Sequence, residues 1–249
     1  MDNEHIAEKD EKNDSLFVDK GDFIKIDFTG RVKPEEYIFD TTSKEVAQAN
    51  GLYNPKINYG PVIVCVGSGM VLKGLDESLI GKELGFDGEI EISPQDAFGK
   101  KDPKLLKLIP TSKFKSYNVV PKPGLQVEVD GMIGFVKSST GGRTIVDFNH
   151  PLSGKVLGYH VKIMNKVDDK KEQVSSVLTM KLNLKPDNYV VDVSENKCNI
   201  ELKGLPDIPD EMSNAISKLI KEVVGFEEIS FYQDKNKKEN ETKESDSEN

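Results

Sequence analysis

The chain has 249 residues, and its 43 acidic side chains outnumber the 34 basic ones, which gives a net charge of −9. This acidic balance disfavours a general nucleic-acid binder, and no apolar run approaches the roughly 20 residues of a membrane span. The acidic first 14 residues lack a signal-peptide core, and Cys65 and Cys198 lie far apart, so we expect a cytoplasmic protein without a disulfide framework.

The N-terminal part predicts a small sheet with two short helices. Residues 1–19 are expected to be disordered or a linker, because the first 15 are highly charged, and residues 16–18 either add an edge strand or belong to that linker. Alternating or continuous apolar side chains predict strands over residues 22–30, 32–39, 61–66 and 89–93. Capping and helical spacing predict short helices over residues 44–50 and 71–80. The Gly67–Gly69 stretch lacks the Gly-Lys-Ser/Thr order of a phosphate loop, so we expect no nucleotide there.

Residues 101–146 have a different character and predict a small β domain of their own. Residues 101–147 hold eight basic and four acidic side chains in an otherwise acidic chain. Strand patterns cover 126–129, 132–136 and 144–148, with a hairpin turn at 139–143. Fewer than 50 residues cannot bury all of its apolar side chains deeply. This favours either an exposed apolar groove rimmed by lysines or an ordinary small core with solvated lysines.

The remainder predicts a closing strand and a further unit. A strand at residues 158–167 completes the first domain, and 168–173 are expected to be a polar linker. Strand patterns follow over 177–184, 189–193, 199–202 and 227–232, with an amphipathic helix over 210–224. This helix either packs on its own sheet or forms a contact with a second copy or a client. Residues 233–249 hold no apolar side chain and are expected to be disordered.

Five motifs stand in order along residues 20–167. They are Asp27-Phe28-Thr29-Gly30 with Phe39-Asp40-Thr41-Thr42, Val64–Gly67, Val71–Asp76, Ile92–Gly99 and Asp147–Lys155. In this order they resemble the FKBP-type peptidyl-prolyl isomerases, in particular the long SlyD-like forms of archaea and bacteria. The resemblance implies an α+β fold in which an FKBP-like antiparallel sheet wraps on a short helix. It also implies a discontinuous isomerase domain (20–100 with 147–167), an insert-in-flap chaperone domain (101–146) and a separate C-terminal α+β domain (174–232).

The function implied is prolyl isomerisation that accelerates protein folding, with the insert binding unfolded chains. The partners expected are unfolded or partly folded proteins and prolyl peptides, and the C-terminal domain is a candidate homodimer contact. Isomerisation twists a resonance-stabilised amide, so it needs no cofactor, and His5 and His160 do not form a metal pair. The alternative is a non-catalytic chaperone or scaffold that binds proline-containing segments.

The resemblance also implies the site residues. The catalytic positions are Phe28, Phe39, Asp40, Leu75, Phe98 and Tyr159, and the substrate-binding positions are Val71, Leu72, His150 and Leu152. The expected chaperone groove comprises Leu106, Ile109, Phe114, Val120, Met132 and Phe135. From the residues alone, the aromatic side chains could equally be core, Asp40 a turn residue and His150 a loop hydrogen-bonder. Leu75 stands where drug-binding members have Trp, and Phe28 and Phe98 replace Tyr, so we expect weaker drug binding with isomerase activity retained.

Overall fold

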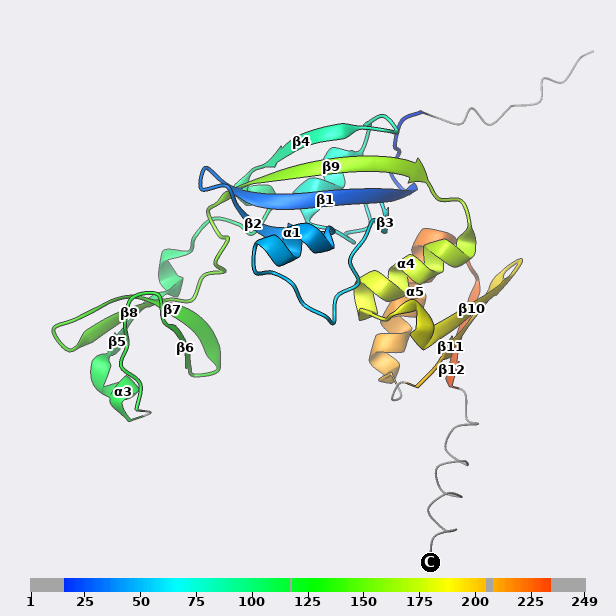
Figure 1. The fold of residues 1–249 in the computed structure, drawn as a ribbon. Helices are drawn as coiled ribbons and strands as arrows, with labels where there is room; N and C mark the ends of the chain where they lie inside the picture. The colour runs from blue at the N-terminus through cyan, green and yellow to red at the C-terminus, as the bar shows by residue number, and fades with distance from the viewer. Residues whose placement is uncertain (1–15, 117, 205–207, 234–249) are drawn as a thin grey trace, which may run out of the picture.

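The computed structural model describes residues 16–116, 118–204 and 208–233. The disorder expected for residues 1–15 and 234–249 concerns residues outside these ranges. Figure 1 shows three β-sheets: a main sheet in the middle, the sheet of the insert at one end and a C-terminal sheet with two helices at the other. The expected α+β class, with an antiparallel main sheet and further β-containing units, is confirmed. None of the described helices combines the length and apolar composition needed to cross a membrane.

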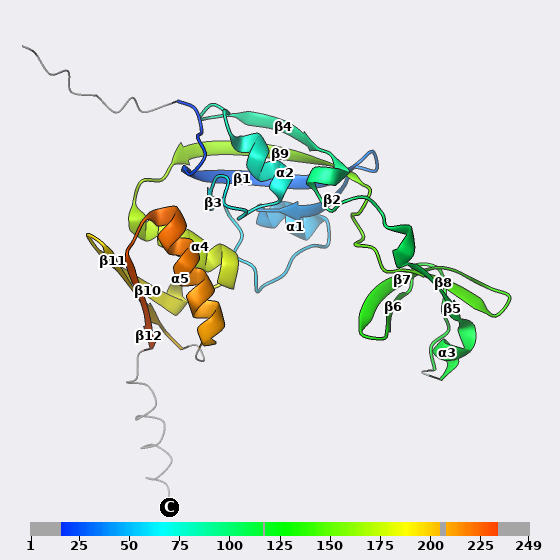
Figure 2. The same ribbon diagram turned by 180° about the vertical axis from the view of Figure 1, so that it is seen from behind.

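The main sheet is wrapped on a short helix. Its strands are β1 (Phe23–Lys33), β2 (Tyr37–Thr41), β3 (Val62–Cys65), β4 (Asp87–Ile92) and β9 (Val156–Lys166). They pair in the order β2-β1-β9-β4, and β3 also pairs with β1. Strand alternation turns Ile24, Ile26 and Val32 of β1 inward. Helix α2 (Lys73–Leu79) covers this face (Figure 2) and buries Leu75 and Leu79.

A capped short helix and an N-terminal segment accompany the main sheet. Helix α1 (Lys44–Ala49) begins after Ser43, whose hydroxyl accepts a hydrogen bond from the Val46 amide, as the sequence predicts. The segment at residues 16–18, which falls in the expected N-terminal linker, runs alongside residues 82–84. The Val18 amide donates to the Lys82 carbonyl at 2.8 Å, and Val18 is fully buried. These residues therefore belong to the edge of the main fold.

The insert is a four-stranded antiparallel sheet. Its strands are β5 (Leu106–Pro110), β6 (Gln126–Val129), β7 (Met132–Thr140) and β8 (Arg143–Asp147), in the order β5-β8-β7-β6. Helix α3 (Thr111–Lys115) follows β5. The short 3₁₀ turns Pro94–Asp96 and Pro103–Leu105 precede β5. The buried hydrophobic residues of this unit include Ile109, Phe114, Val127, Val129, Val136 and Val146. They form a small core separate from that of the main sheet.

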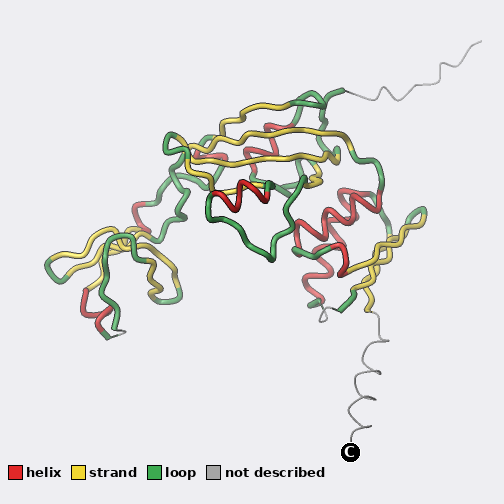
Figure 3. Tube along the Cα trace, viewed as in Figure 1, coloured by secondary structure: helices red, strands yellow, loops and turns green. Residues whose placement is uncertain are grey.

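The two segments that connect the insert to the main sheet lie side by side (Figure 3). The Asp102 amide donates to the Asn149 side chain at 2.8 Å, and the Gly154 amide donates to the Gly99 carbonyl at 2.8 Å. The insert therefore leaves and rejoins the main fold at one place.

The C-terminal unit packs helices on one face of a three-stranded sheet. Its elements are α4 (Lys170–Leu182), the 3₁₀ turn Pro186–Asn188, β10 (Tyr189–Ser194), β11 (Lys197–Leu202), α5 (Asp210–Val224) and β12 (Glu228–Gln233). The strand order is β10-β11-β12, with β11 and β12 parallel. The strand expected over 177–184 is wrong, because residues to Leu182 belong to α4. The expected linker at 168–173 mostly forms the first turn of α4, which Asp169 caps through the Lys171 and Glu172 amides.

The C-terminal unit and the main sheet share one core. Val174, Val177 and Leu178 of α4 are fully buried in the same cluster as the inward side chains of β1 and β9. The Lys181 ammonium group donates to the Gly69 carbonyl at 2.8 Å. Helix α4 therefore docks the C-terminal unit beside β3 and the turn that leads into α2.

Candidate active site

Three aromatic side chains from neighbouring strands meet at one end of the main sheet. Phe28 lies on β1, Phe39 on β2 and Tyr159 on β9, and β1 pairs with both of the other strands. The Tyr159 ring centroid lies 5.7 Å from that of Phe28 and 5.7 Å from that of Phe39, both in edge-to-face geometry. This geometry is favourable for aromatic rings. Tyr159 is buried, whereas Phe28 and Phe39 are only half-buried, so the cluster keeps a side that solvent reaches.

Gly30 makes room for this cluster. It lies directly opposite Tyr159 in the β1–β9 register. A Cβ atom at Gly30 would lie 2.8 Å from the Tyr159 ring and 3.0 Å from the Phe39 ring, closer than normal contacts. The glycine therefore lets two rings occupy the space over its backbone. The sequence motif includes Gly30, but the pattern alone does not reveal this steric role.

Helix α2 and the residues just before it contribute aliphatic side chains to the main core. Leu75 is 1% exposed and belongs to the main core, together with buried Leu152. Val71 and Leu72, just before the helix, are half-buried and pack against the same core. Leu75 and Leu152 thus belong to the hydrophobic core of the main fold, and Val71 and Leu72 lie at its surface.

Asp76 holds the turn before α2 in place, a role the sequence analysis missed. Its buried carboxylate accepts hydrogen bonds from the Gly67 and Gly69 amides, each at 2.8 Å. Both glycines have positive φ, at 80° and 69°, a conformation that glycine adopts without strain. The amides of this turn are therefore used within the chain to position Val71 and Leu72.

Asp40 and Tyr159 share one electrostatic environment. Surrounding protein atoms withdraw the Asp40 carboxyl from bulk water and raise its pKa, although its surface still touches solvent. A hydrogen bond from the Thr41 backbone opposes that rise. Burial raises the pKa of Tyr159, and the negative charge of Asp40 adds to the effect. The cluster thus places a phenol hydroxyl near a carboxylate, even though Phe28 and Phe98 carry no hydroxyl.

A set of threonine hydrogen bonds fixes the strand that carries Phe39 and Asp40. The Phe28 amide donates to the Thr42 hydroxyl at 2.9 Å, and that hydroxyl in turn hydrogen-bonds Asp27. The hydroxyls of Thr29 and Thr41 lie 2.8 Å apart. These contacts tie the end of β2 to β1, which argues against a role for Asp40 as an isolated turn residue.

Phe98 and His150 join the main core to the base of the insert. Their rings stack with centroids 4.2 Å apart and planes within 6° of parallel. Phe98 also packs against the main core, and its carbonyl accepts a 2.9 Å hydrogen bond from Ser153. The Leu152 amide donates to Nδ1 of His150 at 3.2 Å, which orients the imidazole. The stack therefore spans the point where the chain enters and leaves the insert.

The expected groove residues of the insert divide between its two faces. Leu106 and Val120 are exposed, Met132 and Phe135 are half-buried, and Ile109 and Phe114 are buried in the core of the insert. Ile109 and Phe114 therefore do not line an open groove, because α3 and the inner face of the sheet enclose them.

The face of the insert that does open to solvent carries a different set of aliphatic side chains. They are Leu106 and Leu108 on β5, Ile133 on β7 and Ile145 on β8, and we call this set the exposed aliphatic face. Leu108 pairs directly with Ile145, so the two side chains point the same way. Phe135 lies on the same side of the sheet, opposite Asp147.

A buried carboxylate holds the junction between the insert and the main fold. Asp147 accepts hydrogen bonds from the Asn149 amide at 3.0 Å and from the Asn149 side chain at 2.8 Å. Lys101 forms an ion pair with it at 3.1 Å. Burial alone would raise the pKa of Asp147, but the bonds from Asn149 and the Lys101 charge outweigh it, and the pKa lies below its ordinary value. In the described part of the chain, no three His, Cys, Asp or Glu side chains gather as metal ligands would.

Two family models match the sequence. The model described as FKBP-type peptidyl-prolyl cis-trans isomerase matches residues 15–119. The model described as FKBP26, IF domain matches residues 107–152, which contain most of the insert. The matches thus fall on the main sheet and on the insert.

Curated relatives are similar over the same region. A short-type peptidyl-prolyl cis-trans isomerase of Methanocaldococcus jannaschii is 32% identical over 146 residues, which cover 59% of this chain and 92% of that protein. A probable FKBP-type 16 kDa peptidyl-prolyl cis-trans isomerase of Pseudomonas fluorescens is 33% identical over 110 residues, covering 42% of this chain and 72% of that protein. The SlyD isomerase of Helicobacter pylori is 23% identical over 129 residues, covering 51% of this chain and 70% of that protein.

Proposed function

The chain belongs to the FKBP-type peptidyl-prolyl cis-trans isomerases, in their SlyD-like form, and on this premise we propose where its two activities reside. Isomerisation takes place at the cluster of Phe28, Phe39 and Tyr159 with Asp40 at its edge. The exposed aliphatic face of the insert binds unfolded chain and brings its prolines to that cluster. The observation that carries the proposal is the half-open aromatic cluster.

The chemistry needs an apolar surround more than a reactive group. The barrier of about 18–20 kcal/mol comes from amide resonance, which makes the planar prolyl amide more polar than the twisted one. Water stabilises the polar, planar form. A site walled by Phe28 and Phe39 over Leu75 excludes water and so favours the twisted amide relative to the planar one.

Fixed polar groups at the edge of the site add selectivity for the twisted state. The Tyr159 ring is buried between Phe28 and Phe39, and the Thr41 backbone hydrogen-bonds the Asp40 carboxylate, so both groups stand at the site before substrate arrives. Asp40 is exposed at the surface, yet nearby protein atoms partly desolvate its carboxyl group and raise its pKa. A poorly solvated carboxylate interacts more strongly with the dipole of the bound peptide than a hydrated one does.

The exposed aliphatic face supports the second half of the proposal. Leu108 is 58% exposed and Ile133 is 59% exposed, although the insert already has a core without them. Clustered aliphatic side chains on a surface favour contact with other apolar chains. An unfolded client held there lies near the cluster, because the insert rejoins the main fold beside Phe98. Tethering of this kind raises the effective concentration of its prolines at the site.

The test uses cis-trans exchange of an Ala-Pro tetrapeptide, followed by NMR, with a matched pair of glycine variants. Gly30→Ala adds a Cβ that collides with the Tyr159 and Phe39 rings. Overpacking costs about 1–3 kcal/mol, so we expect kcat/KM to fall about tenfold or more. Gly158→Ala is the control, because it lies on the same pair of strands and its Cβ meets only the flexible Lys33 and Arg31 side chains.

Two outcomes contradict the proposal. Equal losses in Gly30→Ala and Gly158→Ala would mean that the aromatic cluster is not the site. If the wild-type protein did not accelerate cis-trans exchange of the tetrapeptide, the alternative function would remain. In that alternative, a non-catalytic chaperone or scaffold binds prolyl segments without isomerising them. Circular dichroism on both variants verifies that they fold.

A further inference from the structure

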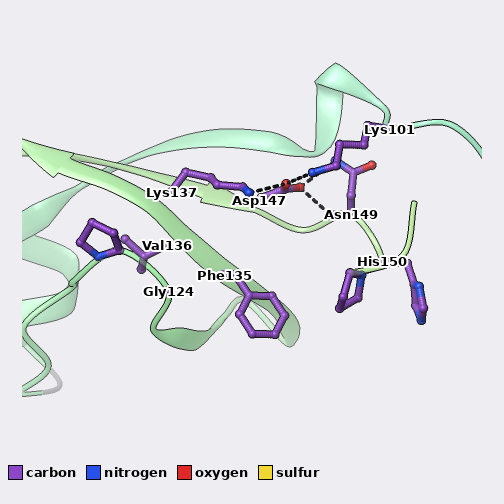
Figure 4. A pocket seen from close by; sticks show the side chains of 10 residues that line it. Lys101, Gly124, Phe135, Val136, Lys137, Asp147, Asn149 and His150 are labelled. Atoms are coloured by element: carbon purple, nitrogen blue, oxygen red, sulfur yellow. Dashed lines mark hydrogen bonds and ion pairs between the residues drawn. The ribbon is translucent and has the colours of Figure 1, made fainter. Parts of the chain in front are cut away.

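A cavity lies at the base of the insert, against the segments that connect it to the main fold and outside the aromatic cluster. Its volume is about 350 Å³, and it is bounded by side chains from both segments that connect the insert. Figure 4 shows Lys101, Lys137 and Asp147 converging on one side, with the Phe135 ring across from them and His150 at one end. The proposed function does not account for this space.

The polar wall of the cavity carries one surplus positive charge. Two lysines converge on the single carboxylate of Asp147, with Nζ–Oδ2 distances of 3.1 Å for Lys101 and 3.8 Å for Lys137. Asp147 is already satisfied by Asn149 and Lys101. The Lys137 ammonium group lies beyond hydrogen-bonding distance of Asp147, and its side chain is 53% exposed. Its three N–H donors can therefore serve a ligand that enters the cavity.

The opposite wall is apolar. Phe135 is half-buried and presents its ring, and Pro151 also lines the cavity. A ligand that matches both walls has a short aliphatic stem and an anionic head. A glutamate side chain has this form, because its two methylene groups can pack on Phe135 while its carboxylate reaches Lys137.

The cavity lies between the two proposed activities. Phe135 is on the same side of the insert sheet as the exposed aliphatic face. His150 lines the cavity and stacks at 4.2 Å on Phe98, which packs against the core of the main fold. A client that runs from the face to the cluster therefore passes the cavity.

From these walls and this position we infer that the cavity is a subsite for an acidic side chain of the client, a few residues from the prolyl bond, which Lys137 recognises. This inference rests on the proposed function and adds a sequence preference to it. The charge of the insert agrees with it, since residues 101–147 hold eight basic and four acidic side chains. An acidic protein that repels acidic clients elsewhere thus attracts them at its client-binding end.

The experiment measures exchange on peptides of about ten residues, long enough at roughly 3.3–3.6 Å per residue to reach from the cluster into the cavity. Each peptide has one Ala-Pro bond and a single glutamate, moved one position at a time on either side of the proline. The reference series carries glutamine at the same places. We expect one position to favour glutamate by about threefold to fivefold in kcat/KM, as a partly exposed ion pair allows.

Lysine variants identify the group responsible. Lys137→Gln should abolish the preference for the glutamate peptide over the glutamine peptide. Lys137→Glu should reverse the charge preference, so that a peptide with lysine at the same position reacts faster. Lys115→Gln is the matched control, because it removes the same charge from α3, away from the cavity, and should keep the preference. Raising the salt to about 1 M, where the screening length is about 3 Å, should also remove it.

The inference is overturned if glutamate and glutamine peptides react equally at every position, or if the preference survives in Lys137→Gln. Thermal unfolding of Lys137→Gln verifies that the variant folds. The wild-type tetrapeptide assay separates this failure from failure of the proposed function. If the tetrapeptide is turned over but the longer peptides show no glutamate preference, only the proposed subsite is rejected. If the tetrapeptide is not turned over, the proposed catalytic site is rejected.

Discussion

The main sheet and the insert each leave one face of an antiparallel sheet open to solvent, but they cover it with different side chains. On the open face of the main sheet, Arg31 and Lys33 form ion pairs with Glu89 and Glu91 of β4. On the open face of the insert, Leu108, Ile133 and their neighbours are aliphatic. A solvated antiparallel sheet normally alternates apolar inward and polar outward residues. The main sheet follows this rule, and the insert departs from it.

The difference separates the apolar side chains that stabilise the fold from those that are available for binding. The main sheet buries its apolar side chains against α2 and continues its core into the C-terminal unit. The insert has its own core and still displays aliphatic residues that nothing in the described structure covers. Exposed apolar side chains add little to folding stability. A binding role explains why they stand there.

Removing the insert tests the comparison with the largest expected effect. Residues 103–146 can be replaced by a short glycine-rich linker, because the Asp102 amide and the Asn149 side chain are hydrogen-bonded and the two ends therefore lie close together. We expect refolding of a proline-limited protein to slow about a hundredfold relative to the intact enzyme, in line with the gain from tethering. Exchange of the tetrapeptide should change little, since Phe28, Phe39 and Tyr159 remain. Unchanged refolding activity in the deletion variant would contradict a client-binding role for the insert.

Local pattern predicted most elements of the fold, because each carries its own signal. Ser43 at the start of α1 and the periodicity of α5 need no tertiary information. Helix α4 was misassigned because its last part alternates apolar and polar residues like a strand. The earlier spacing of Val174, Val177 and Leu178, with Asp169 as the cap, is helical and prevails in the structure.

The site was predictable in its residues but less so in its contacts. The family resemblance implied Phe28, Phe39 and Tyr159 as site residues, whereas the clearance at Gly30 depends on where the rings from neighbouring strands meet. In the insert, alternation along β5 separates Leu106 and Leu108 from Lys107 and Ile109, and the more apolar pair is the exposed one, so pattern could not tell which face α3 and the inner core would cover. This is why Ile109 was expected in a groove and is found in a core. Lys137 was missed because its importance comes from a cavity between distant segments.

Neighbouring residues on β5 allow a sharper test of the two faces. Leu108 is 58% exposed and Ile109 is 7% exposed. Leu108→Ser should leave the free energy of unfolding within about 0.5 kcal/mol, yet weaken binding of an unfolded client about fivefold or more. Ile109→Ala should destabilise the insert by about 2–5 kcal/mol through lost burial and a cavity.

Chemical denaturation and client binding by fluorescence anisotropy measure both quantities. The comparison between faces fails if Leu108→Ser lowers stability as much as Ile109→Ala does. It also fails if Leu108→Ser binds client as tightly as wild type, because the exposed aliphatic face would then have no role.

Acid titration tests the electrostatic role of Asp40 at the edge of the aromatic cluster. The Asp40 pKa is raised by burial, so we expect kcat/KM on the tetrapeptide to fall about fivefold, or about 1 kcal/mol, as pH drops through a midpoint above the ordinary aspartate value of about 3.9. Asp40→Asn should give a flat profile over this range. A midpoint at or below the ordinary value in wild type would contradict the role of Asp40.

The same shift has a consequence for stability with a defined sign. A carboxyl group whose pKa is raised by folding destabilises the folded state when it is ionised. This penalty is complete above the folded pKa and disappears as pH falls below the unfolded value. Asp40→Asn should therefore be more stable than wild type at neutral pH, by a margin that shrinks as the solution is acidified, as thermal unfolding at several pH values can measure.

Phe98→Tyr is expected to have the smallest effect. It tests whether a new polar group is tolerated at residue 98. The Phe98 ring is half-buried and stacked on His150, so a hydroxyl at its edge can reach substrate without entering the core. One added hydrogen bond is worth about 0.5–1.5 kcal/mol, and we expect kcat/KM on the tetrapeptide to rise about threefold. The matched change Phe86→Tyr, on a half-buried ring beside Lys82 and outside the cluster, should leave the rate unchanged. A rate that falls in Phe98→Tyr would mean that the stack with His150, rather than the missing hydroxyl, determines what this position contributes.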